Sequence, residues 1–216
     1  MKIDLHVHTV YSEDSTLQLD DIIRAVGEVK LDGLAITDHN EIKGAQALQQ
    51  IAPFLVIVGE EIMTADGEIT GYFLHEKIEP GLSLLDTIQQ IKAQAGLIAV
   101  PHPFDRLRSS ALKRNKLDLI TGYLDLVEVF NSRNIFQKDN HLAEVFAERS
   151  GFGKIAGSDA HSASEIGSAW IEIETFCGAA DFLNKVKEAT FTASKSSIMV
   201  HVETKAKKII NGIVKK

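Results

Sequence analysis

Two histidines separated by one residue, His6 and His8, stand near the start of the sequence and could together bind a metal ion. They alternate with Ile3, Leu5 and Val7, which is the period-two pattern of a half-buried strand. Alternate residues of a strand point to the same face, about 7 Å apart along it, so both imidazoles would face one ion. An isolated pair of this kind is more often two surface histidines. The interpretation therefore depends on the rest of the chain.

Other histidines and carboxylates stand where predicted strands end. The predicted strands cover residues 31–37, 54–58, 97–100, 126–130 and 154–156. The polar residues at their ends are Asp38 and His39, Glu61, His102, Glu128 and Asn131, and Asp159 and His161. Imidazole combined with carboxylate suits zinc, manganese or iron, whereas magnesium alone would prefer more oxygen ligands. The pattern predicts a site for several divalent ions.

Predicted helices alternate with these strands at least six times, which favours an α/β architecture with a parallel sheet or barrel. The expected helices cover residues 17–30, 43–51, 84–95, 136–149 and 179–189, with a hairpin partner strand at 68–75. In such folds, sites form at the carboxyl ends of the strands. The polar strand-end residues are therefore expected to meet at one end of the sheet.

The composition indicates one soluble domain. The 216 residues are 44% hydrophobic and 25% charged, as in ordinary globular proteins. A formal net charge of −7 argues against a general affinity for the nucleic-acid backbone. No run of 18 apolar residues and no leader segment appear, and the single Cys177 cannot form an internal disulfide. We expect a cytoplasmic protein that does not interact with membranes, in which Cys177 serves packing rather than catalysis.

Five short motifs in chain order resemble those of the PHP (polymerase and histidinol phosphatase) superfamily of metal-dependent phosphoesterases. They are residues 4–9 (Asp-Leu-His-Val-His-Thr), 37–40 (Thr-Asp-His-Asn), 59–62 (Gly-Glu-Glu-Ile), 101–103 (Pro-His-Pro) and 157–161 (Gly-Ser-Asp-Ala-His). The resemblance implies a distorted seven-stranded (β/α)7 barrel, similar to a TIM barrel, with the metal site at the carboxyl ends of its strands. We expect a single domain over residues 1–216, with its core at about 1–195 and a Lys-rich helical tail at 202–216.

The resemblance also implies a ligand set for two or three divalent ions of zinc, manganese or iron, with magnesium as a further option. One ion would be bound by His6, His8, Glu61 and Asp159. Glu61 would bridge to a second ion that His102 also binds. The third would be bound by His39, His161 and Asp14, with Glu13 as the alternative to Asp14. His75 falls near the position of a further histidine ligand in some members, and the alternative is a plain surface residue.

Further polar residues would support this site. By the same resemblance, Glu128 and Asn131 would hold the ligands in place, and Asp38 would orient a neighbouring group rather than bind metal. Three arginines just beyond strand ends, Arg106, Arg108 and Arg133, could bind a substrate phosphate; the alternative for each is a solvated surface arginine.

The expected activity is hydrolysis of a phosphate ester by a metal-activated hydroxide. The substrate would be a small phosphomonoester such as histidinol phosphate or a nucleotide phosphate. A nuclease acting on the ends of short oligonucleotides is one alternative, and a non-catalytic, metal-binding regulatory module is another. No glycine-rich phosphate loop and no Ser-His-Asp order occur, which disfavours P-loop NTP hydrolysis and acyl transfer.

Overall fold

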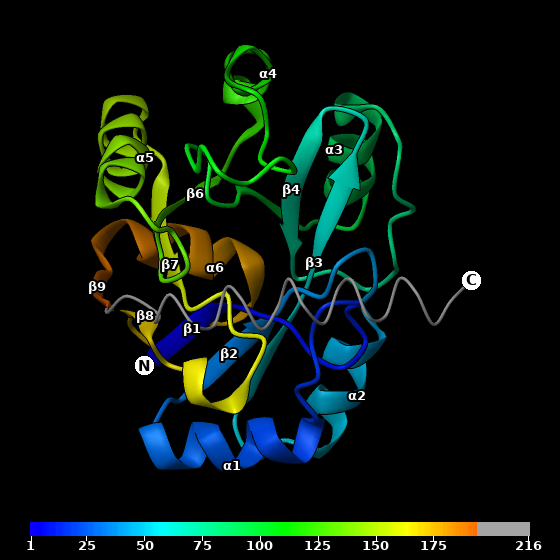
Figure 1. Ribbon diagram of the computed structural model, residues 1–216, viewed down its shortest axis with the longest axis vertical. Helices are drawn as coiled ribbons and strands as arrows, with labels where there is room; N and C mark the ends of the chain where they lie inside the picture. The colour runs from blue at the N-terminus through cyan, green and yellow to red at the C-terminus, as the bar shows by residue number, and fades with distance from the viewer. Residues whose placement is uncertain (194–216) are drawn as a thin grey trace.

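The computed structural model describes residues 1–193, and Figure 1 shows their arrangement. The Lys-rich tail that the sequence analysis expects to be helical lies outside these residues. Within them, every helix is too short or too polar to cross a membrane.

Seven strands follow one another in chain order around a barrel-like sheet. They are β1 (Lys2–Val7), β2 (Gly33–Ile36), β3 (Leu55–Thr64), β4 (Gly67–Tyr72), β5 (Leu97–Val100), β6 (Leu126–Asn131) and β7 (Gly153–Gly157). β4 is antiparallel to both β3 and β5, and the other neighbouring pairs are parallel. This confirms the α/β barrel that the resemblance predicts, with the antiparallel β4 as its distortion.

The sheet closes where the end of β7 meets β1. Val7 forms a parallel bridge with Ala160, and the N–H of His8 donates to the carbonyl of Ala160 at 2.9 Å. Gly157 allows this approach, because a Cβ at that position would lie 2.3 Å from the Cβ of His6. The closure places the end of β7 directly beside the two histidines of β1.

Two further strands extend the sheet beyond the seven strands of the barrel, and the first of them matches the strand that the sequence predicts at residues 170–173. β8 (Ala169–Glu172) pairs antiparallel with Lys2 and Ile3 of β1, and β9 (Thr190–Ala193) pairs with β8. The reason is that β7 reaches β1 only past its carboxyl end. The backbone groups at the start of β1 therefore need another partner, and β8 supplies it.

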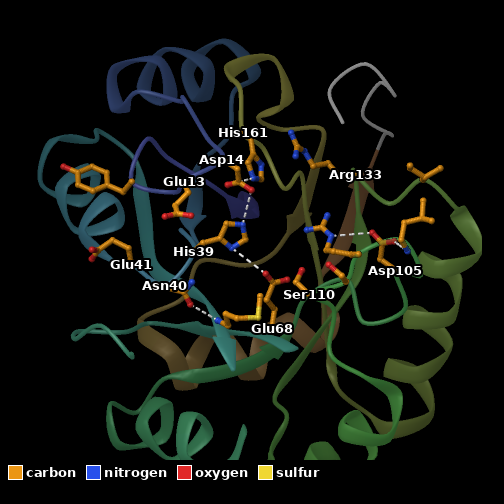
Figure 2. Close-up of a pocket in the computed structure, with 16 residues that line it drawn as sticks. Glu13, Asp14, His39, Asn40, Glu41, Glu68, Asp105, Ser110, Arg133 and His161 are labelled. Atoms are coloured by element: carbon orange, nitrogen blue, oxygen red, sulfur yellow. Dashed lines mark hydrogen bonds and ion pairs between the residues drawn. The ribbon is translucent and has the colours of Figure 1, made fainter. Parts of the chain in front are cut away.

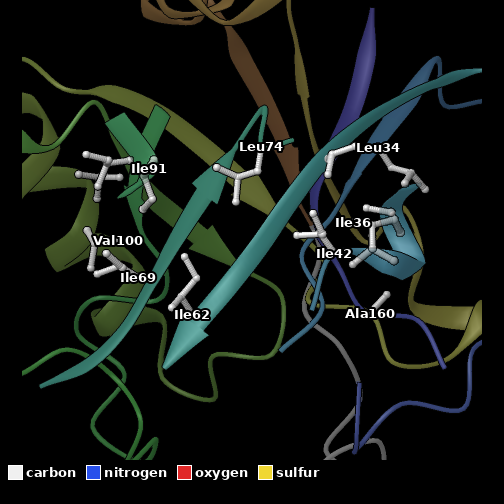
Figure 3. Packing of buried hydrophobic residues seen from close by; sticks show 14 of the residues in the cluster. Leu34, Ile36, Ile42, Ile62, Ile69, Leu74, Ile91, Val100 and Ala160 are labelled. Atoms are coloured by element: carbon white, nitrogen blue, oxygen red, sulfur yellow. The ribbon is translucent and has the colours of Figure 1, made fainter. Parts of the chain in front are cut away.

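Helices surround the sheet, as Figure 1 shows. They are α1 (Leu19–Val29), α2 (Lys43–Ile51), α3 (Leu84–Ala93), α4 (Arg114–Ile120), α5 (Gln137–Ser150) and α6 (Gly178–Lys185), with three short 3-10 helices at Thr121–Tyr123, Ala163–Glu165 and Val186–Glu188. Two apolar clusters pack on the sheet. Leu34 and Ile36 of β2 belong to one cluster (Figure 3), and Ala35 belongs to the other, because successive strand residues point to opposite faces.

Candidate metal centre

The polar strand-end residues come together at one end of the barrel. Each lies in or just after a strand: His6 and His8 with β1, Asp38 and His39 after β2, Glu61 in β3, His102 after β5, Glu128 and Asn131 in β6, and Asp159 and His161 after β7. All are buried except His39, whose side chain is 19% exposed. Burying so many ionisable groups is costly unless they neutralise one another or bind cations.

Four of these residues point their donor atoms at one small volume. Nε2 of His6 lies 3.0 Å from Nε2 of His8, and each lies 3.5 Å from Oε2 of Glu61. Oδ1 of Asp159 is 3.7 Å from Nε2 of His6 and 3.4 Å from that of His8. A tetrahedral zinc site with ligand bonds near 2.1 Å has ligand–ligand edges of about 3.4 Å. The four donors therefore have the spacing of a divalent-ion site.

A second group of donors adjoins the first through Glu61. Nε2 of His102 lies 2.9 Å from Oε1 of Glu61 and 3.8 Å from Oε2 of Glu68. Glu68 is also 3.8 Å from Nδ1 of His39, and its side chain is buried. Oε2 of Glu61 thus faces His6 and His8, and Oε1 faces His102, which is the arrangement expected of a carboxylate that bridges two ions.

Asp14 joins two further imidazoles into a third group. Its Oδ1 lies 3.3 Å from Nε2 of His161, and its Oδ2 lies 3.5 Å from Nε2 of His39. Asp14 is buried, whereas Glu13 is exposed and lines the pocket above (Figure 2). Of the two acidic residues considered, the structure places Asp14 between the histidines.

Three buried carboxylate oxygens in these groups accept no hydrogen bond. They are Oε2 of Glu61, Oε2 of Glu68 and Oδ1 of Asp159. Buried polar atoms normally have hydrogen-bond partners, and a role in binding a cation is one of the ordinary reasons for an exception. Because each of these oxygens faces imidazole nitrogens rather than apolar atoms, the residues present fit bound divalent cations.

The pKa values of the histidines in the first group are shifted, because these residues are buried close to other ionisable groups. Burial opposes the charged form of His6, but Glu128, Asp159 and Glu61 outweigh it and raise the pKa of His6 well above 6.5. Burial and the nearby imidazoles of His161 and His39 lower the pKa of His8 to about 3. His8 is therefore a neutral imidazole near pH 7, the form that a metal ligand requires.

Glu128 and Asn131 contact several of the candidate ligand residues. Oε1 of Glu128 lies 2.9 Å from Nδ1 of His6, so the opposite nitrogen of that ring faces the cluster. Oε2 of Glu128 accepts from the backbone N–H of His102 at 2.7 Å and from the amide of Asn131 at 3.1 Å. The same amide donates to Oδ2 of Asp159 at 3.3 Å.

Asp38 orients the loop after β1. Its carboxylate accepts from the backbone N–H and hydroxyl of Thr9 and from the hydroxyl of Ser12. The oxygen of Ser12 lies 3.1 Å from Nδ1 of His8 and accepts from the backbone N–H of His39. Burial raises the pKa of Asp38 to about 6. Asp38 thus fixes the position of a ligand group through Ser12.

The three arginines occupy different places. Arg108 donates to Oδ2 of Asp159 at 2.6 Å, and Arg133 forms a buried two-point pair with Glu165 at 2.8 and 3.1 Å. Both line a pocket of about 790 Å³ that also includes Asp14, His39, Glu68 and His161 (Figure 2). Arg106 instead pairs with Asp139 and lines a neighbouring hollow, so the structure does not place it at the main pocket.

His75 does not join the cluster. It is exposed, and it follows the end of β4, which lies at the opposite end of the hairpin from Glu68. Its backbone N–H and carbonyl pair with the side chains of Gln94 and Gln46. The alternative interpretation of His75 as a surface residue is the one that the structure favours, because β4 runs antiparallel and carries its far end away from the site.

Sequence reasoning missed Glu68 and Asp4. Glu61 pairs with Thr70 across the β3–β4 hairpin, so Glu68, two residues before Thr70, lies on the same face as Glu61. A register assignment for the hairpin could have found it. Asp4 lies two residues before His6 and accepts from the backbone N–H groups of Ser158 at 2.9 Å and Gly167 at 3.0 Å. It ties β1 to the chain after β7.

The backbone is unusual at two of the candidate ligands. His102 has φ 30° and Asp159 has φ 55°, in the left-handed region that non-glycine residues seldom adopt. Such conformations cost free energy and cluster at functional sites. The surrounding hydrogen bonds therefore hold these two residues in place at the expense of stability.

Comparisons with known proteins agree with the fold and the motifs. A family model described as PHP-associated matches residues 137–191. The uncharacterized protein MJ0417 of Methanocaldococcus jannaschii is 35% identical over 211 residues, which cover 92% of this chain and 85% of that protein.

Two solved structures share the fold at lower identity. PsfC from Pseudomonas syringae PB-5123 has a TM-score of 0.68 at 15% identity and covers 99% of this chain and 98% of its own. A two-domain protein from Bacteroides vulgatus, described as containing a predicted PHP-like metal-dependent phosphoesterase, has a TM-score of 0.61 at 20% identity. It covers 76% of this chain, which corresponds to 53% of that longer protein. The five motifs, the barrel and the PHP-associated family match together show that the chain belongs to the PHP superfamily.

Proposed function

We propose that this protein is a metal-dependent phosphoesterase that hydrolyses small phosphomonoesters. The observation that carries the proposal is the convergence of four donors, from His6, His8, Glu61 and Asp159, at mutual distances of 3.0–3.7 Å. His102 and Glu68 would hold a second ion together with Glu61. Asp14, His39 and His161 would hold a third.

Divalent ions in such a centre supply Lewis-acid stabilisation of a phosphoryl group and lower the pKa of a bound water toward neutrality. The protein's own residues prepare the centre. Glu128 fixes the ring of His6, and Asp38 fixes Ser12 and through it His8. Glu128, Asp38 and Ser12 are buried, so they hold the donor atoms in position before an ion binds.

The pocket above the donors is suited to an anionic substrate. Arg108 and Arg133 line it, and Figure 2 shows Arg133 on the side of His39 opposite to Glu13 and Glu41. Guanidinium groups favour phosphate oxygens. A volume of about 790 Å³ accommodates a small ester such as histidinol phosphate or a nucleotide.

A nuclease acting on oligonucleotide ends is the second candidate. The basic residues of the segment after β5, which include Arg106, Arg108, Lys113 and Arg114, would favour a longer anionic ligand on that side of the pocket. The net charge of −7 disfavours it, because tight binding to a nucleic-acid backbone needs a basic surface. A regulatory module without catalysis would be expected to lack some donors, and here every principal position carries a competent one.

The test combines metal analysis with two substrates. Purified protein is loaded with manganese or zinc and dialysed. Its metal content is measured, and its hydrolysis of a generic phosphomonoester and a phosphodiester is compared. We expect two or three ions per chain and faster turnover of the monoester. His8→Ala should lower metal content and activity together, and His75→Ala, which changes an exposed histidine outside the cluster, should lower neither.

Each outcome bears on a different part of the proposal. Faster turnover of the diester would favour the nuclease. A protein that binds ions but hydrolyses neither ester would favour the regulatory module. Full activity of His8→Ala would show that the centre has been misassigned.

A further inference from the structure

Exposed apolar side chains gather at the mouth of the pocket. Tyr11 is 44% exposed, Leu107 is 59% exposed and Ile135 is 40% exposed, and all three line the pocket. They come from three different loops, which follow β1, β5 and β6. Single exposed apolar residues are normal on a protein surface, but several around one pocket usually mark a ligand. We call these three residues the apolar rim.

Three polar residues that line the same pocket, Asn40, Glu41 and Asp105, are already engaged within the protein. Oε1 of Glu41 accepts from two backbone N–H groups, and its Oε2 pairs with Lys43 at 3.4 Å. Oδ1 of Asn40 accepts from the backbone N–H of Met63. Oδ1 of Asp105 accepts from the N–H of Leu107, and its Oδ2 lies 3.5 Å from Arg108. These groups are therefore poor partners for a hydroxyl-rich substrate.

The floor of the same pocket is polar. His39, His161, Asp14 and Glu68 lie there, beneath the rim. A phosphate group has few atoms and fills only a small part of a pocket of about 790 Å³. The remaining space, which Tyr11, Leu107 and Ile135 border together with polar residues such as Ser109 and Ser110, would hold the alcohol portion of an ester.

From this division we infer that the natural substrate is a phosphate ester with an apolar alcohol portion, bearing an aromatic ring or an alkyl chain. This inference rests on the proposed phosphoesterase function and specifies its substrate class. The phosphate end lies at the candidate metal ligands, and the apolar portion lies against Tyr11, Leu107 and Ile135. Polyol phosphates and simple sugar phosphates without an aromatic or alkyl group, which would leave their hydroxyl groups against this rim, are disfavoured.

The experiment compares 3-phenylpropyl phosphate with glycerol 1-phosphate on the metal-loaded protein. Both are esters of primary alcohols, so their intrinsic reactivity is similar and the ratio of their kcat/KM values reports recognition of the alcohol. Binding of 3-phenylpropylphosphonate and ethylphosphonate, measured by calorimetry, gives a second readout that does not require turnover. The variants are Leu107→Ser and Tyr11→Ser. The control is Leu119→Ser, because Leu119 is 67% exposed on α4 and does not line the pocket.

We expect the unmodified protein to prefer the phenylpropyl ester by at least about tenfold, which is the scale of one or two buried apolar groups. Leu107→Ser and Tyr11→Ser should each reduce this ratio by roughly threefold to tenfold, mainly through KM, and Leu119→Ser should leave it unchanged. Equal kcat/KM values for the two esters, or a ratio that neither rim variant changes, would overturn the inference.

The phosphonates separate this inference from the proposed function. In one outcome neither ester is hydrolysed, but 3-phenylpropylphosphonate binds more tightly than ethylphosphonate and loses affinity in the Leu107→Ser variant. The apolar rim would then be a ligand site, and the phosphoesterase proposal would fail. If the two phosphonates bind equally, the apolar rim does not recognise the alcohol portion, whatever the activity.

Discussion

Arg108, whose side chain is 22% exposed, forms an ion pair with the buried carboxylate of Asp159, in which the guanidinium Nη2 donates to Oδ2 at 2.6 Å. The other oxygen of Asp159, Oδ1, lies 3.4 Å from Nε2 of His8 and accepts no hydrogen bond. One oxygen of the Asp159 carboxylate thus contacts the guanidinium of Arg108, and the other faces the candidate metal position. Burial opposes ionisation of Asp159, but Arg108 and His6 outweigh it and hold its pKa well below the usual value.

Arg108→Ala should destabilise the metal-free protein strongly and the metal-loaded protein much less. Removing Arg108 leaves the buried charge of Asp159 without its guanidinium partner. The loss is expected to be about 3 kcal/mol, the lower end of the range for a fully buried pair, because Arg108 is partly exposed. A bound cation would supply the missing positive charge. Thermal unfolding with a chelator and with added zinc measures both states. Arg24→Ala, which breaks an exposed pair with Asp21 on α1, is the control and should have a small effect that does not depend on metal. An equal loss of stability with and without zinc for Arg108→Ala would contradict this account.

Glu68→Gln should lower the number of ions bound per chain. Its Oε2 is buried, accepts no hydrogen bond and lies 3.8 Å from Nε2 of His102, so the carboxylate charge is expected to serve a cation. Metal content after dialysis should fall by about one ion, with affinity for the remaining ions little changed. Glu79→Gln removes a carboxylate that is 74% exposed and is the matched control. Unchanged metal content in Glu68→Gln would remove this residue from the ligand set.

Glu128→Gln should weaken metal binding although Glu128 lies behind the donor atoms. Its carboxylate holds the ring of His6 and accepts the backbone N–H of His102, and residues in this position typically affect metal affinity by about 10–100-fold. Competition with a chromophoric chelator measures the affinity. Glu172→Gln, an exposed change on β8, should leave it unaltered. Equal affinities for the two variants would show that His6 keeps its orientation without Glu128.

Glu60→Gln should stabilise the protein at pH 8 more than at pH 4.5. Burial raises the pKa of Glu60 from 4.5 to about 7, against the opposing hydrogen bond from the N–H of Ile78. Between these two pH values the folded state binds more protons than the unfolded state, so the contribution of Glu60 to stability falls as pH rises and levels off above pH 7. The difference in the free energy of unfolding between the Glu60→Gln variant and the unmodified protein should grow by roughly 3 kcal/mol at most from pH 4.5 to pH 8. Chemical denaturation of the metal-free proteins across pH measures it, and parallel pH profiles would contradict the raised pKa.

The sequence predicts the barrel and most of the cluster because both depend on local patterns. Apolar strands alternate with helices, and parallel strands bring their carboxyl ends to one edge, so His39, His102 and Asp159 could be expected to meet. Positions that depend on register or on loop paths could not be obtained in this way. Glu68 reaches the site only through the pairing of β3 with β4, and His75 is carried away by the same antiparallel turn.

The loop arginines and the added strands show the same limit. Arg106 and Arg108 stand two residues apart, yet one turns to Asp139 and the other to Asp159, which follows from the path of the loop after β5. β8 pairs with β1 because the barrel closure leaves part of that strand without a partner. Neither result follows from the composition or periodicity of the segments concerned.

Closure of the barrel between β1 and the chain after β7 has a consequence for biosynthesis. The hydrogen bond from the N–H of Ser158 to Asp4 joins residues 154 positions apart, and Asp159 meets His6 and His8 at the same junction. The two histidines leave the ribosome early, but Asp159 can reach them only after the last strand of the barrel has emerged. Contacts so distant in sequence form late in folding. The first group of donors, to which Asp159 belongs, is therefore completed only when the barrel closes.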